Sequence, residues 1–153
     1  MDIHQEVDLL RKIPMLARLD TSKLKLLAFT SRLMHYEDGE VLFSINDPAD
    51  SVYLIIEGEV EIMATTRAGD FTSVVRGVNS LVGEMAVISK SRRSATVRAS
   101  GHVAALCMEG SIFLQLITSN PDVALDVLRQ LSDKLVEAHH ANEALYSQLE
   151  LHS

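Results

Sequence analysis

The chain has 153 residues, of which 47% are apolar and 23% charged, and its formal net charge is −7 at pH 7. This length is sufficient for one domain with a hydrophobic core, and the acidic balance argues against a protein that binds the phosphate backbone of nucleic acid, which needs a clustered basic surface. The one cysteine, Cys107, lies in the apolar run HVAALCM, so a buried and inert thiol is expected and no disulfide framework is possible.

The opening stretch MDIHQEVDLLRK is polar and acidic, unlike a signal peptide, and no apolar run approaches the roughly 20 residues of a membrane span. A reducing, cytoplasmic compartment and no contact with a membrane are therefore expected.

The N-terminal residues are expected to form helices. Apolar residues recur at helical spacing across residues 2–30, Pro14 interrupts them, and Asp20 or Thr21 caps the second helix.

Short strands separated by turn residues are expected across residues 31–109. The pattern reads SRLMHY, EVLFSI, SVYLIIEG, EVEIMATT, FTSVVRG, ATVRAS and HVAALCME, with EDG, NDPAD and RAGD among the turns. Strands this short, with turns every eight to twelve residues, favour a small barrel, roll or sandwich.

One segment, GEMAVISKSRRSATVRA at residues 83–99, contains the only departure from the strand pattern. GEMAVIS is expected to form one turn of helix with Gly83 at its start, where free backbone N–H groups are available to an anion. The planar guanidinium of Arg93 suits a phosphate, and Ser94 adds a hydroxyl. An ionised Glu84 has acceptors and no donor, so it suits sugar hydroxyls. With small side chains at Ala86 and Ala95, the segment predicts a nucleotide that carries one phosphate charge.

The C-terminal residues return to helical spacing. SIFLQLITS ends at Asn120-Pro121, and one long helix is expected from residue 122 to about residue 151. Its apolar stripe alternates spacings of three and four residues from Leu128 to Leu149, which is a heptad seam with Asn142 at one core position. An asparagine there can fix a parallel two-stranded register, so a homodimer through this helix is expected. The alternative is an amphipathic helix that packs only on its own domain.

The segment from Gly83 resembles the phosphate-binding cassette of cyclic nucleotide-binding domains. Gly83-Glu84-Met85-Ala86, six residues and then Arg93-Ser94-Ala95-Thr96-Val97 have the spacing of the kinase regulatory subunits in that family. DGEVLF resembles an early strand turn of the family, NDPADSVYLIIEGEVEI its central hairpin, and SNPDVALDVLRQL the hinge between its last two helices. The resemblance spans roughly residues 7–140, nearly the whole chain.

This resemblance implies a fold and a set of ligand contacts. The fold would be α+β: an antiparallel, jelly-roll-like β-roll over residues 31–109, flanked by N-terminal helices at 2–30 and C-terminal helices at 111–151, in a single domain over residues 1–153. Arg93 would hold the cyclic phosphate and Glu84 the ribose 2′-hydroxyl. The other implied contacts are backbone or hydroxyl groups of Gly83, Met85, Ser94 and Ala95, strand residues Ile62 and Val74 along the base, and Ala138 and His139 of a helix that closes over the purine.

The chain departs from the family pattern at three places. Asn46 and Asn79 stand where turn glycines are usual, and asparagine tolerates the left-handed backbone, so the turns are expected to persist. Arg92 stands in place of a common proline, and it is expected to face water because neighbours on a strand point to opposite faces. Glu84 and Arg93 alone would be interpreted as an ordinary salt bridge; the cassette around them favours ligand binding.

We therefore expect a cyclic nucleotide sensor without catalysis or cofactor, whose ligand, cyclic AMP before cyclic GMP, orders the C-terminal helix and signals to an unidentified downstream protein. The sequence shows no glycine-rich phosphate loop, no nucleophile elbow and no paired zinc ligands. Two alternatives remain. The first is a catabolite activator-type transcription regulator that lacks its DNA-binding domain, since no helix-turn-helix is expected before Ser153. The second is a protein-interaction module with a vestigial pocket.

Overall fold

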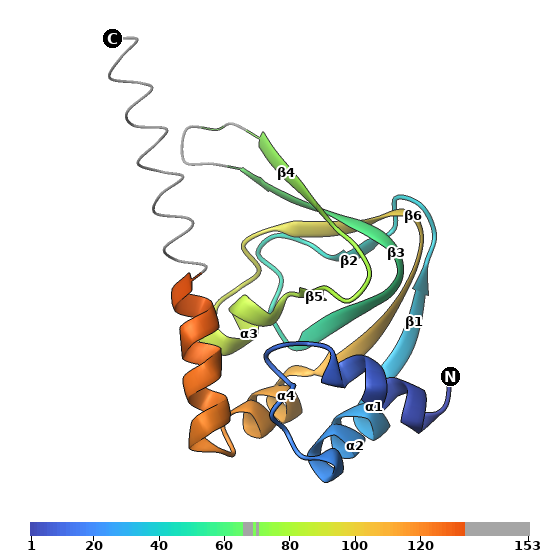
Figure 1. Cartoon of the computed structure of the whole chain (residues 1–153). Coiled ribbons are helices and arrows are strands. Elements are labelled where there is room, and N and C mark those ends of the chain that lie inside the picture. The colour runs from blue at the N-terminus through green and yellow to red at the C-terminus, as the bar shows by residue number, and fades with distance from the viewer. Residues whose placement is uncertain (66–68, 70, 134–153) are drawn as a thin grey trace.

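A computed structural model describes residues 1–65, 69 and 71–133 of the chain (Figure 1). Helices α1 (Ile3–Arg11) and α2 (Thr21–Thr30) come first and are followed by strands β1 (Arg32–Tyr36), β2 (Val41–Phe43), β3 (Ser51–Thr65), β4 (Phe71–Arg76) and β5 (Leu81–Val82). Helix α3 (Glu84–Ser89), strand β6 (Thr96–Glu109), helix α4 (Gly110–Ile117) and a helical segment at 121–133 complete the described chain. The expected α+β order of helices, strands and helices is confirmed.

The helix starts have local causes. Asp2 accepts from the backbone N–H of Gln5 while the Gln5 side chain accepts from the N–H of Asp2, a capping box that begins α1. Asp20, one of the two expected caps, accepts from the N–H of Lys23 at 3.0 Å and begins α2. These hydrogen bonds lower the pKa of Asp20 below its ordinary value, with Ser22 making the largest contribution.

The strands pair antiparallel in the order β1-β6-β3-β4, with β2 added on β6 and β5 on β3. Two pairs of strands that are expected to be separate are continuous. Strand β3 contains SVYLIIEG and continues into EVEIMAT, and β6 runs from TVRAS through Gly101 into HVAALCME. The two glycines inside them have positive φ, 81° at Gly58 and 78° at Gly101. A Cβ at Gly58 would lie 2.1 Å from the backbone oxygen of His102, so glycine is required where the two long strands bend together.

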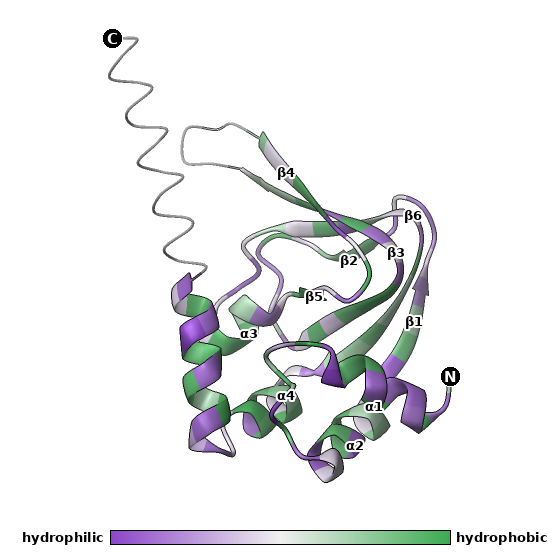
Figure 2. Cartoon of the chain, viewed as in Figure 1, coloured by the Kyte–Doolittle hydropathy of each residue, from purple (hydrophilic) through white to green (hydrophobic). Residues whose placement is uncertain are grey.

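Each long strand separates two clusters of buried side chains. Val52 and Leu54 of β3 pack toward the helices, whereas Tyr53 and Ile55 point into the roll. This alternation follows from the two-residue period of a strand, and both faces are buried where β3 pairs with β6. In Figure 2 these parts of the strands are predominantly hydrophobic.

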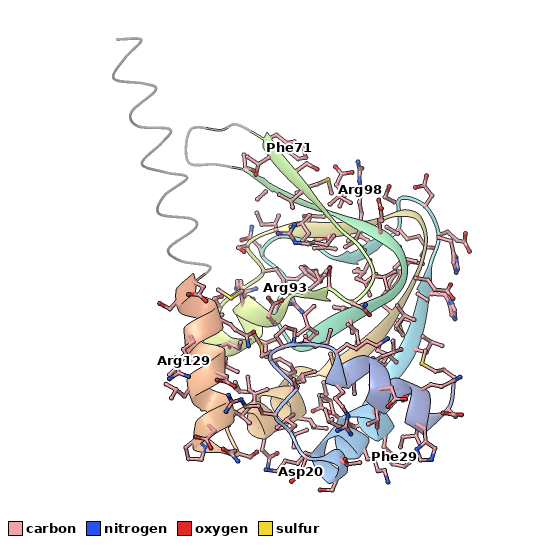
Figure 3. The ribbon with its side chains drawn as sticks, viewed as in Figure 1. Asp20, Phe29, Phe71, Arg93, Arg98 and Arg129 are labelled. Atoms are coloured by element: carbon pink, nitrogen blue, oxygen red, sulfur yellow. The ribbon has the colours of Figure 1, made fainter. Side chains whose placement is uncertain are left out.

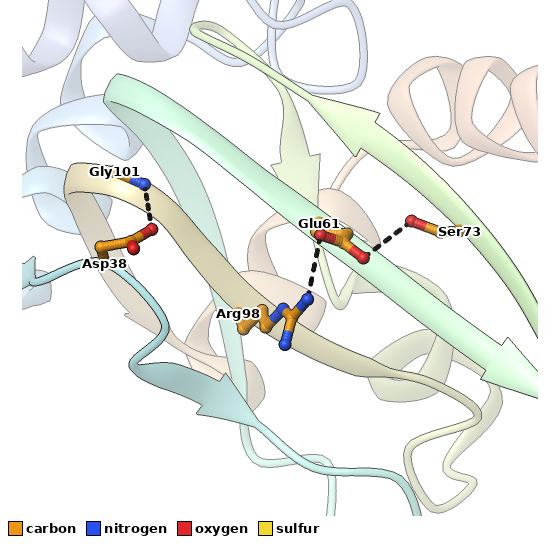
Figure 4. Close-up of polar contacts among 5 residues, drawn as sticks. All are labelled: Asp38, Glu61, Ser73, Arg98 and Gly101. Atoms are coloured by element: carbon orange, nitrogen blue, oxygen red, sulfur yellow. Dashed lines mark hydrogen bonds and ion pairs between the residues drawn. The ribbon is translucent and has the colours of Figure 1, made fainter.

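Polar side chains connect strands on the outside of the roll (Figure 4). Glu61 of β3 accepts from the Ser73 hydroxyl of β4 at 3.0 Å, and its other carboxylate oxygen lies 3.4 Å from Nη2 of Arg98 on β6. Asp38 accepts from the N–H of Gly101 at 2.7 Å. Three strands are thus linked through the half-buried carboxylate of Glu61. Ion pairs near the surface, such as Glu61 with Arg98, contribute little stability.

Candidate anion-binding site

A short helix positions the two ends of the cassette. Gly83 at φ 85° precedes α3, which was expected as one turn of helix beginning there, and Lys90 at φ 54° ends it. Arg93 lies in the segment between α3 and β6, where its N–H donates to the oxygen of Asp47 at 2.9 Å and its oxygen accepts from Asn46 at 2.8 Å. The backbone on both sides of Arg93 is therefore fixed by the turn at residues 46–47.

The Arg93 side chain is buried inside the roll, with 2% of its surface exposed (Figure 3). Its Nη1 donates to the oxygen of Gly83 at 2.8 Å, and its Nη2 donates to the backbone oxygen of Ser51 at 2.6 Å and reaches Ser51 Oγ at 3.5 Å. The guanidinium carbon lies 4.0 Å from the centre of the Phe43 ring, within the range of a cation–π contact. Burial lowers the pKa of this guanidinium below its ordinary value, yet an arginine remains charged.

The Nε atom of this buried cation is unsatisfied within the described part of the chain. Nε of Arg93 is fully covered and has no hydrogen-bond partner within the part of the chain that the structure describes. A buried cation with an unused N–H is costly unless an acceptor or an anion reaches it. The site is therefore chemically suited to an anionic group such as a phosphate oxygen.

Glu84, the first residue of α3, is 5% exposed. It lines a cavity of about 260 Å³ together with Arg76 at the end of β4 and Gln130 of the helical segment at 121–133. A carboxylate at the first turn of a helix is favoured by the helix dipole. The structure therefore places a buried acceptor one residue from Gly83, at a cavity that the last described helix helps to close.

The other expected contacts differ in exposure. Ile62 and Val74 are cross-strand partners on β3 and β4, and Val74 is 44% exposed. Met85 is 42% exposed and Ser94 is exposed, while Ala95 is half-buried. Residues 138 and 139, the expected lid contacts, lie outside the described residues, and so does the heptad seam beyond residue 133.

Arg92 is exposed, as expected, but for another reason. Residues 92–95 precede β6, so the expectation that they lie within a strand is wrong. Nη1 of Arg92 donates to the oxygen of Asn46 at 2.9 Å, which holds it away from Arg93. Asn46 and Asn79 have φ of 73° and 70°, so asparagine does take the left-handed turn positions. Cys107 is buried, as expected.

Two residues of this site were not anticipated from the sequence. Ser51 and Phe43 hold the Arg93 guanidinium, although no motif marks either of them. Ser51 reads as the first residue of a strand and Phe43 as an ordinary strand residue. Only the pairing of distant strands brings them to Arg93.

Neither a metal cluster nor a membrane-spanning helix is found in residues 1–65, 69 and 71–133. No group of three or more histidine, cysteine, aspartate or glutamate residues there could hold a metal ion. Of the helices in this part of the chain, none is long and apolar enough to span a bilayer.

Comparison with known proteins connects this geometry to a family. The model of the family described as the cyclic nucleotide-binding domain matches residues 33–120. A putative potassium channel protein of Rhodopseudomonas palustris is 31% identical over 114 residues, covering 74% of this chain and 27% of the channel. The cAMP-dependent protein kinase regulatory subunit of Dictyostelium discoideum is 29% identical over 113 residues, covering 71% of this chain and 35% of that subunit.

A solved structure shares the fold over most of the chain. The sensor domain of the transcriptional regulator DNR from Pseudomonas aeruginosa superposes with a TM-score of 0.79, at 23% identity, over 90% of this chain and 93% of that one. The expected β-roll flanked by helices is thereby confirmed. The chain spans 35% or less of the length of the two curated relatives above.

Proposed function

The chain belongs to the cyclic nucleotide-binding domain family, and on that premise we propose that it is a sensor without catalysis, with cyclic AMP preferred to cyclic GMP. The preference for adenine is supported by the Dictyostelium relative, which is named for its dependence on cAMP. Ser94, whose hydroxyl is the group that could favour guanine, is exposed.

The observation that carries the proposal is the buried Arg93 guanidinium with an unused Nε. In the proposed complex a cyclic phosphate oxygen accepts from Nε, and the backbone N–H groups near Gly83 and Ala95 add further donors. Two of the three guanidinium nitrogens are already held by Ser51 and Gly83, so the third is presented in a fixed direction. Such preorganisation reduces the entropy lost when the ligand binds.

The remaining contacts follow from the same placement. Glu84 accepts from the ribose 2′-hydroxyl, with Met85 and Ser94 at the edge of the site. Ile62 and Val74 offer adjacent apolar surface to the base, and the exposure of Val74 leaves area for a base to cover. The C-terminal helix closes over the purine through Ala138 and His139, so that the ligand shifts the population of helix arrangements.

The same helix carries the proposed signal to other proteins. The heptad seam from Leu128 to Leu149 forms a parallel homodimer, with Asn142 paired across the two-fold axis. A change in the position of the C-terminal helix then alters a surface that a downstream protein can bind. Leu128 is exposed on the described part of this helix, as a residue of an intermolecular seam would be.

Calorimetry on the intact chain tests the proposal, with cyclic AMP, cyclic GMP and 5′-AMP as ligands. We expect saturable binding of cyclic AMP, weaker binding of cyclic GMP and much weaker binding of 5′-AMP, whose phosphate carries additional charge that one arginine cannot match. A folded chain that binds neither cyclic nucleotide contradicts the proposal and leaves the interaction module with a vestigial pocket.

A further inference from the structure

A second cavity lies beside the Arg93 site, and it is bordered by Val87 and Lys90 at the α3 end of the cassette. It measures about 800 Å³ and is formed by strands β1, β3 and β6, the residues before β3, the end of α3 and the start of α4. Gly83, Glu84, Arg93 and Ala95 do not line it. Its size falls within the range of small-molecule pockets, so a second ligand has room beside a nucleotide.

Part of the cavity wall is apolar. Tyr53 and Cys107 reach it from the cluster inside the roll, and Met34 packs against that cluster. Val87 of α3 and Leu114 of α4 add aliphatic surface. A ligand with an apolar body gains free energy by covering these groups.

Two cations, Arg32 and Lys90, face the cavity. Neither makes an ion pair or side-chain hydrogen bond within the described part of the chain. The two acids at the cavity are engaged: Asp50 accepts from the Ser51 hydroxyl at 3.2 Å, and Glu109 accepts from the Ser111 hydroxyl at 2.7 Å. The uncompensated donors are therefore the cationic ones, and a carboxylate matches the fork of an arginine.

We propose that this cavity binds a small monocarboxylate with an apolar body, and that its occupant changes the affinity of the Arg93 site. The apolar body lies against Tyr53, Cys107 and Leu114, and the carboxylate reaches Arg32 and Lys90. The start of α4 at Gly110 also borders the cavity, and the positive end of its dipole favours the same charge.

Ser51 connects the two sites. It lines the cavity, and both its backbone oxygen and its hydroxyl face Nη2 of Arg93. Tyr53, two residues further along β3, lines the same wall. A carboxylate ligand that moves Ser51 therefore moves an acceptor of Arg93. This coupling rests on the proposed function, whereas binding in the cavity does not.

Octanoate is a suitable probe, and the nucleotide-free intact chain is the first sample. We expect octanoate to bind in calorimetry and to slow alkylation of Cys107, the one cysteine of the sequence, as followed by mass spectrometry. Octanol and octylammonium keep the apolar body without the negative charge, so both should bind at least tenfold more weakly. Equal binding of octanol and octanoate, or no binding and no protection of Cys107, overturns the site.

Substitutions locate the carboxylate. Arg32→Gln and Lys90→Asn should each weaken octanoate binding about tenfold; asparagine is used at Lys90 because it tolerates the left-handed backbone there. Lys12→Gln is the matched control, since Lys12 is exposed and lines neither cavity. Octanoate binding that is unchanged in both Arg32→Gln and Lys90→Asn overturns the assignment of the cavity.

A second titration measures coupling. Saturating octanoate should change the dissociation constant of cyclic AMP at least fivefold, within the usual range of coupling between sites. If octanoate binds and the cyclic AMP constant is unchanged, the coupling is refuted and the site stands. If no cyclic nucleotide binds at all, the proposed function and the coupling fail together, while the octanoate titration alone still decides the cavity.

Discussion

Nη2 of Arg93 donates to the backbone oxygen of Ser51 at 2.6 Å, although the two residues are 42 positions apart. The contact joins the segment before β6 to the first residue of β3. It helps to hold the arginine in place, while Nε has no hydrogen-bond partner among the residues that the structure describes. The predictions below ask what this arrangement does for binding and stability.

Arg93→Ala should weaken cyclic nucleotide binding far more than Arg92→Ala. Loss of one partner of a buried charge pair costs about 2–5 kcal/mol, roughly thirty-fold to a few thousand-fold in the dissociation constant. Arg92 is the matched control, because it is exposed and bonded to Asn46. Calorimetry and a thermal melt of each variant separate lost binding from lost fold; Arg93→Lys, which keeps the charge, is the substitute if Arg93→Ala unfolds. Equal losses in folded Arg92 and Arg93 variants would refute the phosphate assignment.

Glu84→Gln should weaken binding less than Arg93→Ala. The amide keeps an acceptor for the ribose hydroxyl, so a neutral hydrogen bond replaces a charged one at a cost of about 1 kcal/mol. Titration of both variants with cyclic AMP makes the comparison. If Glu84→Gln abolished binding while Arg93→Ala left it intact, the assignment of the phosphate to Arg93 and of the ribose hydroxyl to Glu84 would be wrong.

Gly83→Ala should reduce both stability and nucleotide affinity. An alanine Cβ there would lie 2.5 Å from Nη1 of Arg93, at a φ of 85° that side chains rarely adopt. The backbone strain alone costs on the order of 1–3 kcal/mol. Gly39→Ala is the control, since its φ of 82° is similar and no heavy atom lies within 4 Å of the added Cβ. Thermal melts should fall for both, and calorimetry should show lost affinity only for Gly83→Ala.

Phe43→Leu should destabilise the chain by removing the ring beneath Arg93. The cation–π contact contributes on the order of 0.5–2 kcal/mol, in addition to the lost packing. Phe71→Leu, at a ring that is mostly exposed on β4 (Figure 3), is the comparison. Chemical denaturation of both variants provides the measurement, and equal changes in unfolding free energy would mean that the contact contributes nothing.

The intact chain should be a dimer in light scattering, and a chain that ends after residue 137 should be a monomer. This truncation removes the seam positions from Ala138 to Leu149. The remaining seam is shorter than the three or four heptads that a coiled coil requires. A monomeric intact chain at micromolar concentration, with and without ligand, would mean that the seam is an intramolecular face.

The order of elements could be predicted because turn residues and spacing are local signals. The continuity of β3 and β6 could not, because a glycine inside an apolar run reads as a turn. Gly58 bends a strand instead, and the reason is the nearby backbone of His102 on another strand. Such a contact exists only once the strands have paired.

The same distinction applies to the site. Arg93 and Glu84 could be selected from the sequence because the cassette places both within eleven residues. Their burial, and the support of Arg93 by Ser51 and Phe43, depend on strands far apart in the chain. The exposure of Ser94 could not be predicted from the sequence either, because it results from the irregular segment before β6.

The pairing of β3 with β6 also bears on how quickly the chain can fold. Their ladder joins Ser51 to Glu109 and Met63 to Thr96, so it closes a loop that contains β4, β5 and α3. Contacts between such distant residues slow folding, and domains built on them refold in milliseconds to seconds. Arg93 reaches Ser51 only after this ladder has closed. A newly made chain is therefore unable to hold an anion at Arg93 until the last of its strands has docked.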